Sequence, residues 1–249
     1  MDRQISLLIP SRGRPERLIE MIASAWGTSD KTLQPLQFCI GLDEDDPAYS
    51  TYNKVLEEAE TTLNLAYHIS SKRMSAPDHL NKMATTIASG HLMFALGDDV
   101  IFRTPGWNKQ INNAWDMIPD NILIAYCNNG MNREKCEHFI LHSDWIRITN
   151  NICPPYFRHF CVDAWVEDIA KRINRLVWLQ HVIVEHMHFK YGKALIDETY
   201  KEVRQIIKDP LIPEIDSISK ADYAIYVNHK VDRVRIAEKL HEYISSKRT

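Results

Sequence analysis

The chain has 249 residues, of which 45% are hydrophobic and 25% are charged, the proportions of an ordinary globular protein. Its formal charge of −3 at pH 7 gives no overall attraction to nucleic acid or to anionic membranes, and no apolar run approaches the roughly 20 residues that cross a bilayer. The five cysteines include no CxxC pair, which favours reduced thiols over a disulfide scaffold and predicts a cytoplasmic protein (host cytoplasm, if viral).

The first half of the chain alternates between segments typical of strands and of helices. Strands are predicted at residues 5–9, 36–42, 65–69, 91–96 and 122–126, and helices from Pro15, over 48–62, from the capping box at 75–78, and near 106–118. This alternation predicts an α/β fold with a mostly parallel sheet and helices on both faces. In such sheets a ligand lies beyond the carboxyl ends of the strands, so the polar segments that follow the strands gather at one edge.

The pattern changes after about residue 130. Loops are predicted at 128–132 and 149–160, an amphipathic helix from Val162, and a late strand over 177–184. The remainder reads as helical, most clearly at 195–208 and 231–245. The simplest organisation is one domain, residues 1–193, with a helical extension, residues 194–249, packed on it.

Two arginines bracket a glycine directly after the first strand, in Pro10-Ser11-Arg12-Gly13-Arg14. Guanidinium groups at the start of a helix bind anions well, because the helix N-terminus also carries positive charge. A surface turn with solvated arginines has the same pattern. The segment is therefore a candidate anion site that needs support from its neighbours.

Two further polar positions follow the second strand and the capping box. Asp43 stands at the strand tip, where its carboxylate can accept hydrogen bonds from a ribose or a base, whereas Glu44 and Asp46 fit a solvated acidic loop equally well. Asn81 costs some stability in an otherwise well-formed helix, and a bound ligand or simple exposure to solvent explains it.

The apolar segment 94–96 ends in Gly97-Asp98-Asp99 and resumes as Val-Ile-Phe. Two adjacent carboxylates at the end of a buried strand repel each other and lose hydration, so they need a compensating partner. Hard carboxylate oxygens suit Mg²⁺ or Mn²⁺. An acidic turn after a strand is the ordinary alternative.

Together these pieces resemble the GT-A glycosyltransferases, particularly the family 2-like members, over roughly residues 4–192. The resemblance rests on the segment 10–15, on Asp43, on Asn81 and on Gly97-Asp98-Asp99. The last of these looks like the family's acidic metal motif, although it reads Gly-Asp-Asp rather than the commoner Asp-x-Asp. The fold implied is GT-A-like (Rossmann-like).

The resemblance implies a nucleoside-diphosphate sugar as donor, with its diphosphate held by Mn²⁺ or Mg²⁺. Lys193, which follows the late strand, can add a second positive contact to a phosphate, although a solvated lysine at a helix entry is the commoner case. The expected donor-binding residues are Pro10, Ser11, Arg12, Arg14, Asp43, Asn81, Asp98 and Lys193.

The resemblance also implies the metal ligands. Asp99 is expected to touch the ion, and Asp98 to lie nearer the donor ribose. The late Glu185-His186-Met187-His188 is similar to the histidine that completes the family's metal shell. His186 and His188 stay candidates together because residues i and i+2 of a strand face the same way, and His188 is preferred as the one nearer the strand exit. The cysteines and histidines at 136, 138, 153, 159 and 161 have no compact zinc-binding spacing.

An inverting transfer needs a general base for the acceptor hydroxyl, and Asp163 is the candidate. Its neighbours on the helix, Glu167 and Asp168, have basic partners four residues on, at Lys171 and Arg172, whereas Asp163 has the like charge of Glu167. The alternative is that Asp163 only complements the helix dipole in the first turn.

The sequence thus predicts a metal-dependent hexosyl- or pentosyltransferase acting on a soluble acceptor. A hydroxymethylated pyrimidine in DNA, as in phage genome modification, is the favoured acceptor, because the loop 151–160 carries aromatic and cationic side chains. The basic cluster near Arg233 in the final helix is interpreted first as a solvated face and second as phosphate contacts. A nucleotidyltransferase, which normally has a glycine-rich loop after strand one, and a non-catalytic nucleotide-sugar-binding module are the alternatives.

Overall fold

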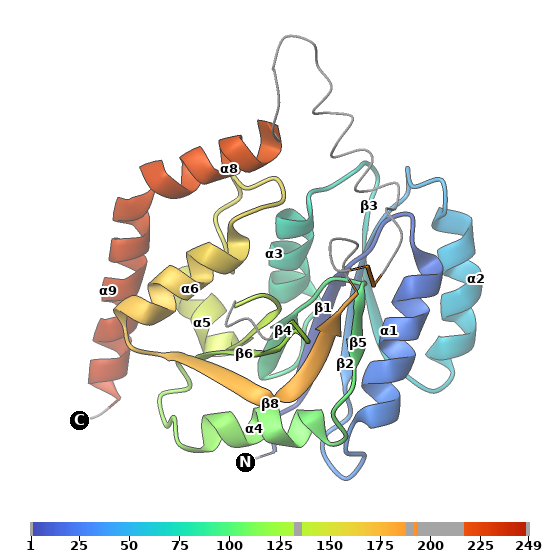
Figure 1. The fold of residues 1–249 in the computed structure, drawn as a ribbon, viewed down its shortest axis with the longest axis horizontal. Helices are drawn as coiled ribbons and strands as arrows, with labels where there is room; N and C mark the ends of the chain where they lie inside the picture. The colour runs from blue at the N-terminus through green and yellow to red at the C-terminus, as the bar shows by residue number, and fades with distance from the viewer. Residues whose placement is uncertain (1, 132–135, 188–191, 194–216, 248–249) are drawn as a thin grey trace.

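The computed structural model describes residues 2–131, 136–187, 192–193 and 217–247. Its strands form one eight-stranded sheet in the order β3-β2-β1-β4-β7-β6-β8-β5 (Figure 1). Its strands are β1 (Ile5–Pro10), β2 (Gln37–Asp43), β3 (Asn64–Ser70), β4 (Leu92–Ala95), β5 (Val100–Phe102), β6 (Ile124–Asn128), β7 (Phe139–His142) and β8 (Leu176–His186). Its helices are α1 (Pro15–Thr28), α2 (Tyr49–Glu60), α3 (Ala76–Thr86), α4 (Trp107–Asp116), α5 (Ser143–Thr149), α6 (Val162–Arg172), α8 (Ser217–Asn228) and α9 (Lys230–Ser246).

The sheet has a parallel half and a mixed half. β3, β2, β1 and β4 run parallel to one another. β7 is antiparallel to both β4 and β6, β6 is parallel to β8, and β5 is antiparallel to the end of β8. The predicted α/β architecture is confirmed, and the parallel pairings are concentrated where strands and helices alternate in the sequence.

The strands of the parallel half are apolar on both faces because helices cover both. In β1, Leu7 and Ile9 contribute to one core and Leu8 to the other, as expected from the alternation of side chains along a strand. One core lies against α1, α2 and α4, and the other against α3, α5, α6 and α9. Both faces of the central strands β1, β2 and β4 are thus buried, which leaves the strand ends for polar side chains.

Two helices begin where local signals in the sequence predict. Pro15 occupies the first turn of α1, and the Ser75 hydroxyl caps α3 by accepting the backbone N–H of Asp78 at 3.2 Å. β7 and α5 are short elements within a region where the sequence pattern predicts no regular structure. The predicted helix at 195–208 lies outside the described residues.

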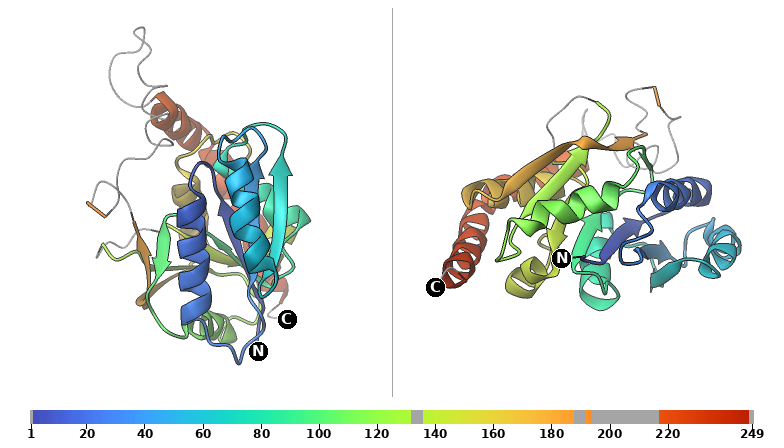
Figure 2. Two further views of the ribbon diagram at one scale, coloured as in Figure 1. Left: turned by 90° about the vertical axis from the view of Figure 1, so that its right-hand side faces the viewer. Right: turned by 90° about the horizontal axis from the view of Figure 1, so that it is seen from below.

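The helices α8 and α9 lie on the opposite side of the molecule from α2, and α9 packs on α5 and α6 (Figure 1 and Figure 2). Arg233 of α9 is only 3% exposed, and its guanidinium pairs with Asp168 of α6 at 2.6 Å and lies over the ring of Trp165. The interpretation of Arg233 as part of a solvated or phosphate-binding face is therefore wrong. No helix among the described residues is long and apolar enough to span a bilayer.

Candidate functional site

The strand ends of the parallel half bring three predicted positions together. The Ser11 hydroxyl, which follows β1, donates to Asp98 at 2.6 Å and lies 2.8 Å from the hydroxyl of Tyr52. Asp43, at the tip of β2, is 2% exposed and receives hydrogen bonds from Arg12 at 3.1 Å and from the backbone of Met74 at 3.0 Å. The topology therefore gathers the polar segments at one edge, as the sequence predicts.

Asp98 is buried beneath Arg14. The guanidinium of Arg14 contacts both oxygens of the Asp98 carboxylate, at 2.5 and 3.1 Å, and reaches within 3.7 Å of Asp99. Burial raises the pKa of Asp98, while the charge of Arg14 opposes this effect. Arg14 therefore lies between the two acids and stabilises the negative charge of both.

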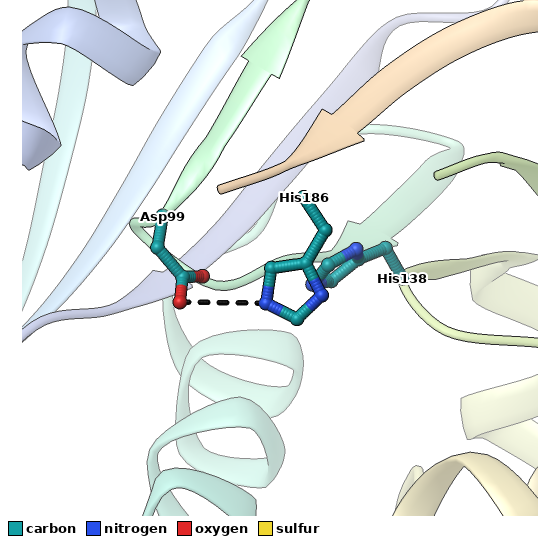
Figure 3. A group of neighbouring side chains, drawn as sticks. All are labelled: Asp99, His138 and His186. Carbon is teal, nitrogen blue, oxygen red and sulfur yellow. Dashed lines mark ion pairs between the residues drawn. The ribbon is translucent and has the colours of Figure 1, made fainter. Parts of the chain in front are cut away.

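Asp99 faces two histidines that come from distant parts of the chain. One ligand atom from each of Asp99, His138 and His186 lies within 4.8 Å of the others, and Figure 3 shows the Asp99 carboxylate pointing at the His186 ring. The Nε2 of His186 lies 3.4 Å from the Asp99 carboxylate, and the rings of His138 and His186 meet edge to face at 4.9 Å. This set of one carboxylate and two imidazoles suits a divalent transition metal.

The pairing of β5 with β8 explains why Asp99 and His186 meet. Val100 is opposite His186 in that antiparallel pair, and the backbone N–H of Met187 donates to the carbonyl of Asp99 at 2.8 Å. The three apolar residues after the paired aspartates thus form a strand of their own, which holds the end of β8 beside the acidic turn. His188, the other candidate of the pair, lies outside the described residues.

Gly97 allows the Asp99 carboxylate to lie where it does. A Cβ atom at position 97 would stand 2.6 Å from Oδ1 of Asp99, closer than real Cβ contacts allow. Any side chain here would push the carboxylate away from the histidines. The Gly-Asp-Asp order therefore has a steric reason.

Glu137 orients His186 from the opposite side. Its carboxylate lies 3.4 Å from Nδ1 of His186 and accepts a hydrogen bond from Asn129 at 2.9 Å. Burial lowers the pKa of His186, but its contacts with Asp99 and Glu137 outweigh this and raise it to about 9. Burial alone would raise the pKa of Asp99, whereas the proton-bearing His186 brings it below its usual range.

In the sequence, His138 belongs only to a group of cysteines and histidines whose spacing does not fit a zinc site. Burial is the first cause that lowers its pKa to about 4, so the imidazole is neutral at physiological pH and able to ligate. Its Nδ1 is buried and has no hydrogen-bond partner among the described residues. The other ring nitrogen, Nε2, is the one beside Gly97 and the Asp99 carboxylate, so His138 can contribute it to the donor set, and no sequence motif marks this residue.

A cavity of about 340 Å³ opens in front of these side chains. Arg14, Asp99, His138 and His186 line it, and so does the start of α6 with Asp163. Its remaining lining is largely apolar: Pro77 and Leu80 of α3, Phe139 of β7, and Phe160 and Val162 at the entry to α6. The cavity thus joins the candidate metal ligands to the candidate base.

Two of the three acidic residues of α6 form the ion pairs that their spacing predicts. Glu167 pairs with Lys171 at 2.5 Å, and Asp168 pairs with Arg172 at 3.2 Å. Asp163 lies in the first turn and lines the cavity, with the backbone N–H of Ala164 donating to its carboxylate at 2.8 Å. It is the acid of this helix that reaches the cavity.

Of the eight predicted donor-binding residues, Pro10 and Arg14 line the cavity. Ser11, Arg12, Asp43 and Asp98 belong to the network at the strand ends and are not in its lining, and Asn81 and Lys193 make contacts elsewhere. The side-chain amide of Asn81 donates to the carbonyl of Cys153 at 2.8 Å and accepts the backbone N–H of Ile152 at 2.9 Å. These bonds explain an asparagine in α3, whereas the sequence predicts either a ligand contact or exposure to solvent. Lys193 pairs with Glu185 at 2.7 Å. All five cysteines are free thiols.

No protein-family model and no curated protein matches the sequence. Several solved structures match the fold. TarS 1–349 of S. aureus in complex with UDP has a TM-score of 0.58 at 14% identity, and the match covers 73% of this chain and 59% of TarS 1–349. The mannosyltransferase PcManGT of Pyrobaculum calidifontis, in complex with GDP-Man and Mn²⁺, has a TM-score of 0.61 at 10% identity, covering 99% of this chain and 75% of that one.

GalNAc-T7 with UDP, GalNAc and Mn²⁺ has a TM-score of 0.61 at 8% identity, and the match covers 75% of this chain and 44% of GalNAc-T7. At such identities the likeness establishes the fold alone. The chain has the GT-A-like α/β fold that its sequence predicts.

Proposed function

We propose that this chain is a metal-dependent glycosyltransferase that moves a sugar from a nucleoside diphosphate to an acceptor hydroxyl. The observation that carries the proposal is the convergence of Asp99, His138 and His186 in the lining of a cavity that Asp163 also lines. The fold neighbours support it, because the structures of PcManGT and GalNAc-T7 hold a nucleotide or nucleotide sugar together with Mn²⁺.

Asp99, His138 and His186 would hold the ion, and His186 would release its proton as the ion binds, because a ligating imidazole nitrogen is deprotonated. We propose Mn²⁺ over Mg²⁺, because imidazole nitrogen suits transition metals whereas Mg²⁺ prefers oxygen and water ligands. When bound, the ion would stabilise the negative charge that the departing nucleoside diphosphate develops. Arg14, which lines the same cavity, supplies a second positive charge on that side.

The donor nucleoside is proposed to lie along the strand ends at Pro10, Ser11, Arg12 and Asp43, with Asp98 beneath it. The carboxylates of this region are already compensated by Arg12 and Arg14, so the surface keeps its shape without a ligand. Such preorganisation lowers the cost of binding. Asn81 is left out of this proposal because its amide is bonded to the loop at 152–153, and the role of Lys193 stays a prediction.

Asp163 is proposed as the general base. Its carboxylate takes the proton of the acceptor hydroxyl, whose oxygen forms the new bond to the anomeric carbon while the bond to the diphosphate oxygen breaks. This is an inverting displacement. The apolar lining near Phe139 and Phe160 favours an acceptor that presents an apolar ring face beside its hydroxyl. A hydroxymethylated pyrimidine in DNA is one such acceptor, although the burial of Arg233 removes part of the support for a DNA contact.

The experiment is a binding and turnover screen with UDP, GDP, UDP-GlcNAc and GDP-mannose, each with and without Mn²⁺. We expect at least one diphosphate to raise the melting temperature only with Mn²⁺, and its sugar derivative to release nucleoside diphosphate. Release of pyrophosphate from a nucleoside triphosphate would instead identify a nucleotidyltransferase. Failure of every nucleotide to bind with Mn²⁺ would overturn the proposal, and binding without turnover on any acceptor would indicate a non-catalytic module.

A further inference from the structure

A buried carboxylate of α8 accepts hydrogen bonds from the main chain of a segment that lines the cavity. Asp222 has an exposed fraction of 0%, although aspartate is rarely fully buried without a partner. Its two oxygens accept the backbone N–H groups of Arg158, His159 and Phe160 at 3.0, 2.9 and 2.7 Å. Three consecutive amides thus converge on one side chain that lies more than sixty positions further along the chain.

The segment that Asp222 holds leads directly into the candidate base. His159 and Phe160 line the cavity, and the next residue is Cys161, which caps the N-terminus of α6 and has a positive φ of 66°. A non-glycine residue in this left-handed conformation needs support from its surroundings. The bonds to Asp222 fix the backbone just before this turn, and so they fix the direction in which Asp163 enters the cavity.

The same contact is not needed to attach the C-terminal helices. Leu240 and Ile244 of α9 are buried in the core beside α6, and Arg233 pairs with Asp168. A charged group costs free energy when it is buried, and apolar packing would attach α8 at no such cost. A carboxylate, unlike an apolar side chain, can accept hydrogen bonds from several N–H groups in fixed directions, and these bonds fix the shape of a loop.

We propose that Asp222 is the positioning residue of the acceptor side of the site: it holds the segment 158–160 so that Asp163 faces the reacting centre. The proposal rests on the proposed function for its catalytic part. It assigns the C-terminal helices a part in the reaction, because the part of the cavity lining at His159 and Phe160 is held by Asp222 of α8.

The test compares Asp222→Asn with Asp168→Asn, which weakens the attachment of α9 to α6 and contacts no backbone amide of the segment 158–160. Asparagine keeps the shape of aspartate, but its NH₂ group cannot accept a hydrogen bond, so at least one of the three amides loses its acceptor. In Asp222→Asn we expect amide hydrogen exchange at 158–160 to accelerate about tenfold or more, as a lost hydrogen bond of ~1.4 kcal/mol gives.

The functional readout is the Mn²⁺-dependent hydrolysis of UDP-GlcNAc or GDP-mannose. In Asp222→Asn we expect kcat to fall about tenfold or more, because a small misplacement of a reacting group costs that much, while the Kd of the nucleoside diphosphate with Mn²⁺ stays within twofold. In Asp168→Asn we expect a lower melting temperature with wild-type exchange at 158–160 and wild-type kcat. This split separates positioning from a loss of stability.

Wild-type exchange and wild-type kcat in Asp222→Asn would overturn the proposal, as would an equal fall of kcat in Asp168→Asn. If the asparagine variant does not fold, Asp222→Glu keeps the charge and moves it by one methylene, and a reduced kcat with an unchanged Kd is then expected; a wild-type kcat would again overturn the proposal. If the wild-type protein binds no nucleotide with Mn²⁺, the proposed function fails, whereas amide exchange still decides whether Asp222 holds the segment.

Discussion

The two sides of the cavity are held together in different ways. On the strand-end side, buried carboxylates are compensated by arginines, as Asp43 is by Arg12 and Asp98 by Arg14, although Asp43 also accepts the backbone N–H of Met74. On the α6 side, Asn81 and Asp222 instead bond to the backbone of the loop that follows α5. Charge pairs fix the groups that meet an anionic ligand, whereas bonds to the backbone fix the shape of a wall. The difference suggests that the two sides can be changed independently.

The largest effect is expected from Asp99→Asn, which breaks the strand-end side at its metal ligand. An amide is a weaker ligand than a carboxylate and adds no negative charge, so we expect Mn²⁺ affinity and Mn²⁺-dependent hydrolysis to fall by about 100-fold or more. Isothermal titration with Mn²⁺ measures the first and nucleotide release the second. Asp45→Asn, at an exposed partner of Arg12, is the control and should keep wild-type affinity. Unchanged turnover in Asp99→Asn would remove the metal hypothesis.

The next effect is expected from Asp163→Asn, which tests the other side. Loss of a general base lowers the rate by about 10²–10⁴-fold. The Kd of UDP or GDP with Mn²⁺ should stay within twofold, because Asp163 is not one of the three candidate metal ligands. A wild-type rate would exclude Asp163 as the base and leave the strand-end side of the proposal intact.

A smaller effect is expected from Gly97→Ala. The added methyl group would meet the Asp99 carboxylate at 2.6 Å, so the carboxylate must move, and we expect Mn²⁺ affinity to fall by about 10–100-fold. The matched control is Gly27→Ala, at a helix position with no heavy atom within 4 Å of the new Cβ. That variant should gain about 0.5–1 kcal/mol of stability with wild-type Mn²⁺ affinity. Equal affinities in the two variants would show that Asp99 does not need its present position.

The smallest functional effect is expected from Asn81→Ala, which sharpens the comparison. The backbone groups of Ile152 and Cys153 lose their partner, so we expect the free energy of unfolding to fall by about 1–3 kcal/mol in denaturant titrations. The Kd of UDP or GDP with Mn²⁺ should be unchanged. A tenfold weaker Kd would instead return Asn81 to the donor-binding residues that its sequence position suggests.

The strand-end side was predictable because each of its parts has a local signal. An apolar run such as 94–96 followed by Asp98 and Asp99 indicates a buried strand with an acidic tip, and the order of elements predicts where such tips meet. His138 and Asp222 carry no comparable signal. Their roles depend on β7 and α8 meeting distant loops, and a single histidine or aspartate in such a segment has the pattern of a surface residue.

Arg233 is a case in which the sequence pattern predicts exposure and the structure shows burial. Its interleaving with Asp232 and Glu238 is typical of a solvated helix face, yet the helix turns this one arginine inward onto Asp168 and Trp165. The sequence contains the charge pattern, but the face of α9 that is buried depends on how it docks on α6. Helix docking is a property of the whole fold, which a window of sequence does not contain.

The pairing of β5 with β8 also has a consequence for the order in which the site forms during synthesis. During synthesis from the N-terminus, the arginine loop and the paired aspartates leave the ribosome well before His186, which arrives on the last strand of the sheet. A nascent chain that ends before β8 carries Asp99 without the opposing imidazole of His186. If Asp99 and His186 hold the proposed ion, tight binding requires that β8 has joined the sheet, and the bound ion would then stabilise the folded protein after its sheet is complete.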